Sequence, residues 1–356
     1  MSFRTRRVLF STPFYMLYEF FLLKYVFLLL GGVDDSYILI LTVIIGLIRF
    51  MPTLFEERKS RKVTRFLSTV DGVWMWASVM FLIDILIIYL LGSFAKLSFE
   101  INLILLAIVP ALGLYNYWKA HKLVVNERKI VLDNLEHDIN IAQLSDVHFG
   151  SVRHRQIISQ IASRLNELKD TCDIAIISGD LADGSAMVEA DDFMAFKDVE
   201  MPIIFTPGNH DYYIGINNVV CACENAGVIV LDNDSLEFDC LNIYGASYSL
   251  DDKDIPKIDE SVVMGDKVNI LNYHVPYYFK EFSRMGFNLQ LSGHTHGGQF
   301  HPVTFISDLL FKYNKGLFKD NRGNYIHVTT GVGSMDTPMR WGTDSEIVVL
   351  KLRGKD

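Results

Sequence analysis

The sequence predicts two parts of different fold class: an all-α membrane domain over residues 1–122 and an α/β domain over residues 123–356. Half of the 356 residues are hydrophobic, and the mean hydropathy of +0.22 is higher than that of ordinary soluble domains. The apolar excess lies before about residue 120. Short β-rich runs that alternate with amphipathic stretches follow it, and this pattern is typical of a layered α/β domain.

The two parts also differ in net charge. Residues 1–122 contain 13 Lys and Arg against 8 Asp and Glu, a net charge of +5, whereas residues 123–356 contain 20 against 34, a net charge of −14. An acidic second domain argues against binding to nucleic acid, because affinity for a phosphate backbone comes from Lys and Arg. We therefore expect no nucleic-acid partner.

Four apolar stretches in the first domain are long enough to cross a bilayer, which takes about 20 residues per helix. The third carries one charge, Asp84, and has Trp74 and Trp76 near one end, where aromatic side chains favour the membrane interface. The first is too long for a signal peptide and lacks a small-residue cleavage site, so we expect it to be retained. The expected spans are residues 9–32, 36–53, 72–92 and 99–118.

Basic residues are concentrated at the N-terminus and in alternate loops, whereas the intervening loops contain Asp34, Asp35 and Lys96. Short loops rich in Lys and Arg stay in the cytoplasm. We therefore expect an integral protein of the plasma (inner) membrane, with both termini and the second domain in the cytoplasm and the lipid bilayer as a partner. The basic residues are Arg4, Arg6 and Arg7, then Arg58, Lys59, Arg61, Lys62 and Arg65, and finally Lys119, Lys122, Arg128 and Lys129.

Three charged residues, Glu19, Lys24 and Asp84, lie well inside expected spans. Charges within a membrane are costly and often mark a transport pathway. Pairing between helices, or snorkelling in the case of Lys24, is the simpler interpretation.

The second domain contains one clear amphipathic helix and eight expected strands. The helix covers residues 154–168 and has Ile157, Ile161 and Leu165 on one face. Together these elements predict helices packed on β-sheet. The strands are residues 139–145, 173–178, 202–206, 228–231, 268–273, 288–292, 325–329 and 346–352.

Metal-binding residue types follow five of these strands. Open α/β sheets place their sites at the carboxyl ends of strands, so we expect the five loops to converge. In the first of them, an extended Asp-x-His tripeptide would direct both side chains to the same side, where one metal ion can bind both. In chain order the residues are Asp146 and His148, then Asp180, then Asn209, His210 and Asp211, then His274, and then His294 and His296.

This ordered set, D-x-H, G-D, G-N-H-D, a single His and G-H-x-H, resembles the calcineurin-like metallophosphoesterase family over about residues 138–352. The tract GHTHGGQ at residues 293–299, with YNKG at 313–316 and PMR at 338–340, is similar to the subgroup containing membrane-associated bacterial phosphoesterases. The wider family includes enzymes that split UDP-diacylglucosamine. The resemblance implies a metal-dependent phosphoric ester hydrolase with a four-layer α/β/β/α sandwich and two divalent metal ions at the sheet edge.

The resemblance also implies a role for each residue. His210 matches the family's non-ligand histidine, which donates a proton or hydrogen bond to the ester, and Asp211 would orient the His210 imidazole. Mixed carboxylate, imidazole and amide ligands favour Mn, with Fe and Zn as alternatives. One ion would be held by Asp146, His148, Asp180 and His296, and the other by Asp180, Asn209, His274 and His294.

Three further residues, His154, His301 and Arg340, are candidates for substrate binding. A guanidinium such as that of Arg340 suits a second phosphate group. An ordinary surface role is the alternative for each of the three.

Four membrane helices fused to a phosphoesterase favour a substrate met at the bilayer, such as a phospholipid or a lipid-linked phosphoester or diphosphate, hydrolysed by metal-activated water. In a first alternative the substrate is a soluble nucleotide or phosphoprotein and the helices are only an anchor. In a second alternative the protein is a membrane transporter or sensor that its phosphoesterase domain regulates. Deletion of residues 1–122 distinguishes the first two hypotheses, because an anchor can be lost without a change in kcat/KM.

Overall fold

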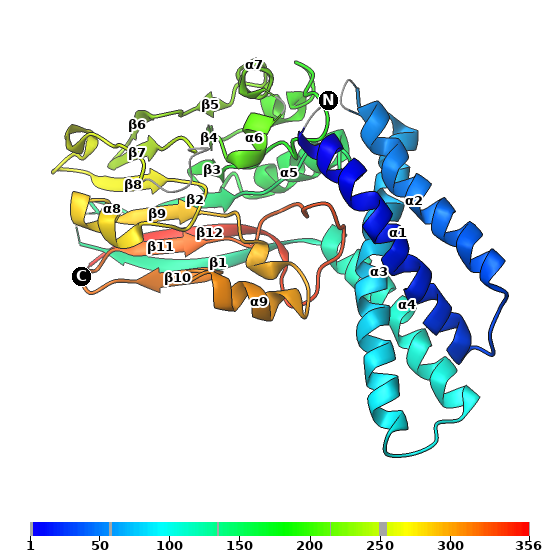
Figure 1. Cartoon of the computed structure of the whole chain (residues 1–356). Coiled ribbons are helices and arrows are strands. Elements are labelled where there is room, and N and C mark those ends of the chain that lie inside the picture. Colours follow the sequence, from blue (N-terminus) through cyan, green and yellow to red (C-terminus); the bar gives the residue numbers. More distant parts are fainter. Residues whose placement is uncertain (1–2, 57–58, 134, 214, 249–254, 356) are drawn as a thin grey trace. The chain divides into compact units, whose positions relative to one another are not determined.

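The computed structural model describes residues 3–56, 59–133, 135–213, 215–248 and 255–355. The chain divides into two compact units, drawn together in Figure 1. One unit consists of residues 1–121 and 336–339, and the other of residues 122–335 and 340–356. Arg58, one of the basic loop residues named above, lies outside the described residues.

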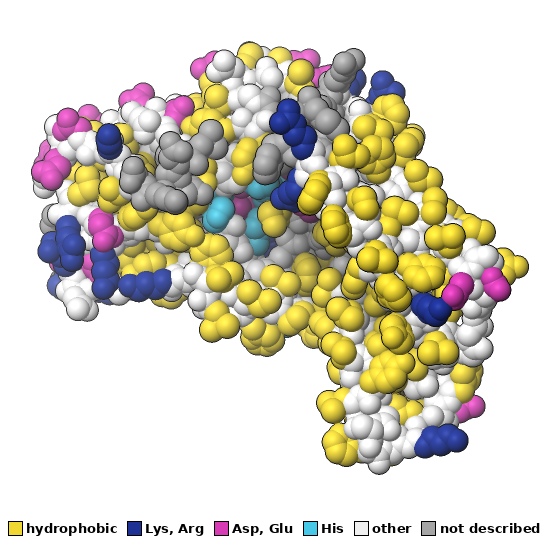
Figure 2. All heavy atoms as spheres, in the orientation of Figure 1, with side chains coloured by type: hydrophobic (Ala, Val, Ile, Leu, Met, Phe, Trp, Pro, Cys, Tyr) yellow, Lys and Arg dark blue, Asp and Glu magenta, His cyan; other side chains and the backbone are white. Residues whose placement is uncertain are grey.

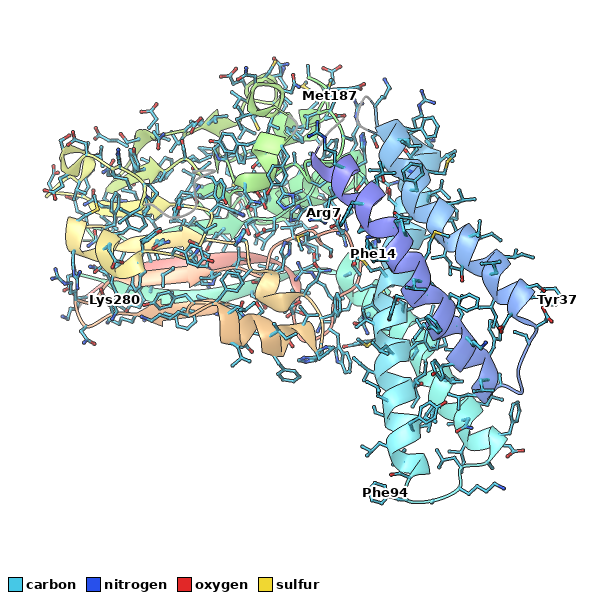
Figure 3. All side chains as sticks on the ribbon, viewed as in Figure 1. Arg7, Phe14, Tyr37, Phe94, Met187 and Lys280 are labelled. Carbon is cyan, nitrogen blue, oxygen red and sulfur yellow. The ribbon has the colours of Figure 1, made fainter. Side chains whose placement is uncertain are left out.

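Among its described residues, the first unit has four helices that are long and apolar enough to cross a membrane. Consecutive helices pack against one another. Large apolar side chains are exposed on the helices, such as Phe14 and Tyr37, and Phe94 is exposed in the connection between the third and fourth helices (Figure 3). The third helix begins well before the expected span at residue 72, because basic and polar turns precede its apolar part. The helices are α1 (Phe3–Leu29), α2 (Asp35–Glu56), α3 (Lys62–Gly92) and α4 (Phe99–His121).

Charged side chains inside this unit form contacts between helices. The carboxylate of Glu19 accepts a hydrogen bond of 3.0 Å from the indole of Trp74, which joins α1 to α3. The ammonium group of Lys24 lies 2.7 Å from the carboxylate of Asp35. These contacts match the simpler interpretation of Glu19 and Lys24 as pairing residues.

In the part of the chain that the structure describes, the second unit forms two six-stranded sheets, each mixed in strand direction. In the first sheet the central strands β2, β3 and β4 are parallel, and in the second β7, β8, β9 and β11 are parallel. The first sheet has the order β1 (Leu123–Leu132), β12 (Ser345–Gly354), β2 (Ile139–Leu144), β3 (Ile174–Ser178), β4 (Ile203–Thr206) and β5 (Ile229–Val230). The second has the order β10 (Gly316–Lys319), β11 (Tyr325–Val328), β9 (Leu289–Ser292), β8 (Val268–Asn272), β7 (Leu241–Gly245) and β6 (Asp234–Phe238).

Alternate residues of the strands enter different hydrophobic layers, as the pleat of a strand requires. Ile141 of β2 and Ile270 of β8 belong to one buried cluster, which lies between the two sheets. The neighbouring Leu144 packs instead with helices α5 (Arg155–Glu167) and α7 (Ile216–Asn225) on the outer face of the first sheet. Helix α8 (Phe279–Met285) covers the outer face of the second sheet. The four-layer α/β/β/α sandwich expected from the sequence is confirmed.

Candidate metal centre

The predicted metal-binding residues lie in loops that follow the carboxyl ends of β2, β3, β4, β8 and β9. Parallel neighbours end on the same side of a sheet, so these loops meet at one edge of the sandwich. Figure 2 shows histidine side chains (cyan) at the surface of this unit with acidic side chains (magenta) beside them.

The first group of candidate ligands consists of Asp146, His148 and His296, which are all buried. The Nε2 atoms of His148 and His296 are 3.0 Å apart. Asp146 Oδ1 lies 3.4 Å from Nε2 of His296 and 3.8 Å from Nε2 of His148. Three potential ligand atoms this close together form a suitable site for a cation.

The second group consists of Asp180, His274 and His294. Asp180 Oδ2 lies 3.1 Å from His274 Nε2, and His294 Nδ1 lies 3.1 Å from the amide oxygen of Asn209. Asp180 also belongs to a further group, with His148 and His210, whose ligand atoms lie within 4.8 Å of one another. The Asp180 carboxylate is therefore shared between the two sides of the centre.

The backbone at these residues is unusual. Asp146, His148, Asp180, His294 and His296 all have φ between 49° and 71°, in the left-handed region. Asp and His tolerate this region better than branched residues do, but such a conformation persists only where the surrounding structure enforces it. The extended Asp-x-His tripeptide assumed from the sequence is wrong, because both of its outer residues are left-handed.

Two glycines let the ligand loops approach one another closely. A Cβ atom on Gly179 would lie 2.4 Å from Nδ1 of His274, and a Cβ atom on Gly208 would lie 2.3 Å from Oδ1 of Asp180. Gly179 also has φ of +86°, a conformation that other residues rarely adopt. The glycine before each of these motifs is therefore a packing requirement of the centre.

Main-chain groups orient the ligands. Nδ1 of His274 lies 2.8 Å from the carbonyl oxygen of Ser178, which fixes this nitrogen as the donor and directs Nε2 toward Asp180. The backbone N–H of His294 donates to the Asp146 carboxylate at 3.0 Å, which links the β2 and β9 loops. The serine hydroxyl of Ser145 donates to the same carboxylate.

The structure corrects the role of Asp211. Its carboxylate accepts hydrogen bonds from three backbone N–H groups, those of Asp180 (2.9 Å), Ala182 (2.8 Å) and Gly208 (2.8 Å). The His210 imidazole is instead oriented by the carbonyl oxygen of Asp183, which lies 2.8 Å from Nδ1. Asp211 therefore ties the β3 loop to the β4 loop, because three donors already occupy its two oxygen atoms.

Burial and neighbouring charges move the pKa values of these groups in opposite directions. Burial raises the pKa of Asp146 to about 6, although the nearby His274 lowers it. Burial lowers the pKa of His274, but the carboxylates of Asp180 and Asp146 outweigh this effect and raise it to about 9. Burial and the neighbouring His148 lower the pKa of His296 well below its usual range. The centre thus combines an imidazole that holds its proton with one that readily stays neutral.

The side chains fit divalent cations. Within the described part of the chain, Nε2 of His274, the atom that faces Asp180, is buried and has no hydrogen-bond partner. A buried polar atom without a partner is unfavourable unless another group, such as a cation, satisfies it. The combination of carboxylate, imidazole and amide donors suits a transition metal.

The structure corrects the expectation for Arg340, which is completely buried and so cannot contact a substrate. Its guanidinium donates to the carbonyl oxygens of Thr330 (2.7 Å), Gly333 (2.5 Å) and Asp344 (2.5 Å), so it holds two loops together. His301 stacks on Phe305 with ring centroids 4.9 Å apart.

His154, the third candidate for substrate binding, precedes α5 and packs on Phe149 with ring centroids 4.4 Å apart. Neither His154 nor His301 belongs to the groups of candidate ligands found among the described residues.

Sequence reasoning missed Tyr213. Its hydroxyl accepts a hydrogen bond of 3.1 Å from the side-chain amide of Asn209, and its ring lies 4.9 Å from that of His210. Tyr213 follows Asn209 by four residues on the short helix α6 (Asn209–Tyr213), so helical spacing was the available signal.

Comparisons with known proteins relate this chain to metallophosphoesterases. A sequence model described as calcineurin-like phosphoesterase matches residues 139–298. The chain is 29% identical over 245 residues to a metallophosphoesterase of Helicobacter pylori, an alignment that covers 65% of this chain and 64% of the relative. Residues 139–298 therefore form a calcineurin-like phosphoesterase domain.

Two other relatives show how widely the likeness extends. A metallophosphoesterase of Aquifex aeolicus is 29% identical over 265 residues, covering 70% of this chain and 98% of the relative. A transmembrane protein with metallophosphoesterase domain from Danio rerio is 28% identical over 285 residues, covering 74% of this chain and 64% of the relative. The chain therefore spans less than two thirds of the length of the Helicobacter and Danio relatives.

Proposed function

We propose that this protein is a membrane-anchored phosphoesterase that uses two divalent metal ions to hydrolyse a phosphoester or diphosphate bond in a phospholipid or lipid-linked substrate. The observation that carries the proposal is the position of Asp180, which belongs to two groups of candidate ligands in one buried centre. The fusion of this centre to four membrane-capable helices supports a substrate presented by a bilayer.

Each ion would be held by four side chains, with Asp180 common to both sets. Manganese suits this donor set best, with iron and zinc as alternatives. Such ions supply Lewis acidity to a phosphoryl group and make water a better nucleophile. The first set is Asp146, His148, Asp180 and His296, and the second is Asp180, Asn209, His274 and His294.

His210 would act on the ester without binding an ion. A carbonyl oxygen can only accept a hydrogen bond, so the contact with Asp183 places a proton on Nδ1 of His210. In the protonated ring Nε2 is then the donor, and it can give its proton to the departing oxygen. His210 is only partly buried, unlike His148 and His274, which leaves it accessible to a substrate.

The positive-inside rule supports a cytoplasmic location for the catalytic unit. Lys119 and Lys122 flank the end of α4, which leads directly into the first strand of that unit. A substrate would then be drawn from the cytoplasmic leaflet of the plasma (inner) membrane.

The proposal is tested with the full chain in detergent, supplied with Mn²⁺ and a panel of lipid phosphates, lipid diphosphates, soluble nucleotides and phosphoproteins. We expect lipid substrates in micelles to be hydrolysed with the highest kcat/KM. We expect His210→Ala to lower kcat by about 10²- to 10⁴-fold, the usual contribution of a general acid. A much higher kcat/KM for soluble substrates would refute the lipid assignment, and an unchanged kcat in the variant would refute the role of His210.

A further inference from the structure

Apart from Asp308, which accepts a hydrogen bond from Asn314, the exposed side chains of helix α9 (Val303–Leu310) are apolar, and its buried face is polar. Thr304 and Ser307 are buried, whereas Leu309 is 87% exposed and Leu310 is 72% exposed. Ser307 donates a hydrogen bond of 2.7 Å to the side chain of Asn314, so its burial is satisfied. Phe305 and Ile306 are also exposed, and yellow side chains cover α9 in Figure 2. A helix that faces only water has the opposite arrangement.

Helix α9 is fixed to the loop that carries two candidate metal ligands. A Cβ atom on Gly298 would lie 2.6 Å from Cα of Thr304, so the helix packs directly on the GHTHGGQ tract. The hydroxyl of Thr295 donates to the carbonyl oxygen of Asn314, just beyond the helix, at 2.5 Å. The ring of Phe311 lies 6.0 Å from that of His294. The apolar face is therefore held next to the centre.

A basic cluster adjoins the end of α9. Five exposed cations line a groove of about 400 Å³ together with Tyr313, Asp320 and Asn321. Lys312 follows the helix by two residues and belongs to this groove. Lys280, labelled in Figure 3, comes from α8. The cluster stands out because the α/β domain has a net charge of −14. Its members are Lys280, Arg284, Lys312, Lys319 and Arg322.

We propose that the apolar face of α9 inserts into the headgroup and acyl boundary of an anionic bilayer, with the basic cluster bound to lipid phosphates beside it. An exposed apolar helical face flanked by Lys and Arg is the arrangement of helices that lie in a membrane interface. The proposal rests on the membrane attachment in the proposed function, but not on the choice of substrate. It places the mouth of the metal centre at the lipid surface.

The test uses the full chain in vesicles of phosphatidylcholine and phosphatidylglycerol. Leu309→Cys, in a Cys221→Ser background that removes the exposed native thiol, receives an environment-sensitive fluorophore. Ser235→Cys on exposed β6 is the matched control. We expect lipids with a nitroxide on the acyl chain to quench the label at position 309 at least about threefold more than the label at 235. Iodide, a quencher that stays in the water, should quench the label at 235 more than the label at 309.

Equal lipid quenching at the two positions would overturn the inference. A label at 309 that is shielded from both quenchers would also overturn it, because a second protein surface would then cover α9. Replacing phosphatidylglycerol by phosphatidylcholine, or changing Lys312 and Lys319 to Gln, should lower quenching at 309 by about twofold. Quenching unchanged by either alteration would refute the part assigned to the basic cluster.

Hydrolysis in the same vesicles separates this inference from the proposed function. Strong lipid quenching at 309 without hydrolysis of any lipid supports the interfacial position of α9 and refutes the lipid substrate. Hydrolysis of lipid without preferential quenching refutes only the position of α9.

Discussion

Replacing Asp211 with Asn separates two roles that the same residue could have. If Asp211 holds the ligand loops, as its three backbone donors indicate, the substitution should weaken the fold and the affinity for metal. If it oriented His210, the substitution should lower kcat and leave stability unchanged. Asn has nearly the same shape as Asp, so no cavity complicates the comparison.

The size of the effect follows from the hydrogen bonds. One carboxylate oxygen of Asp211 accepts from Asp180 and Gly208, and the other accepts from Ala182. An amide oxygen can replace only one of them, and the NH₂ group that replaces the other turns a donor toward a donor. A buried N–H group left without an acceptor costs about 1–3 kcal/mol, and the bonds that remain lose their charged acceptor. We therefore expect Asp211→Asn to lower the free energy of unfolding by about 2–4 kcal/mol.

The assay is thermal unfolding of the full chain in detergent with a fixed Mn²⁺ concentration, followed by kinetics at saturating metal. If Asp211 holds the ligand loops together, the variant should have a lower unfolding midpoint and a raised Mn²⁺ dissociation constant. Much of its kcat should return when metal is in excess. His210→Ala provides the contrasting variant, with a low kcat and a nearly unchanged midpoint. An Asp211→Asn protein that behaves like His210→Ala in all three measurements would refute the reasoning.

Three further predictions address the centre. The pKa of His274 is raised to about 9, and its imidazole must lose a proton to bind a cation. The Mn²⁺ affinity measured by calorimetry should therefore rise about tenfold per pH unit from pH 7 to 9 and then level off. An affinity that does not change with pH would contradict this prediction. Gly208→Ala should abolish metal binding, because the added Cβ atom would overlap Asp180. Gly265→Ala, which has open space around it, is the control and should bind metal normally. Equal metal binding by the two variants would contradict the packing argument. Arg340→Lys should lower the free energy of unfolding by about 2–4 kcal/mol, because hydrogen bonds to buried carbonyl oxygens are lost. An unchanged unfolding midpoint together with a raised KM would instead indicate that Arg340 contacts the substrate.

The elements that sequence reasoning found are those with a strong hydrophobic pattern. All eight expected strands are present, and the helix expected over residues 154–168 is α5 (Arg155–Glu167). Four strands were not expected, namely β1, β6, β7 and β10. Three of them, β1, β6 and β10, lie at the ends of the two sheets. An edge strand is partly solvated and carries charged residues, as Glu127 and Arg128 do in β1, so its apolar pattern is weak.

The convergence of the candidate ligands was predictable from their positions after strands, but the means of holding them was not. Asp211 contacts backbone groups about thirty residues earlier in the chain, at Asp180 and Ala182, and no local pattern specifies such a bond. The contacts of Arg340 are equally hard to predict from the sequence, because its carbonyl acceptors lie in two loops that meet only in the folded chain. From the sequence, Arg340 in the PMR tract was interpreted as a substrate-binding residue. In the folded chain its guanidinium instead satisfies buried main-chain carbonyl oxygens.

The conformation of the ligands explains why so many groups support them. A non-glycine residue held in a sparsely populated region costs about 1–3 kcal/mol, and five candidate ligands are left-handed. Their combined cost is comparable with the net stability of a whole domain, about 5–15 kcal/mol. The bonds from Asp211 and the close packing at Gly179 and Gly208 hold these residues in place before any cation binds. A cation that satisfies the buried Nε2 atom of His274 then adds its binding free energy to the folded state alone. The left-handed loops and the candidate metal ligands are therefore one structural unit, in which the contacts that position the ligands also hold the backbone in its unfavourable conformation.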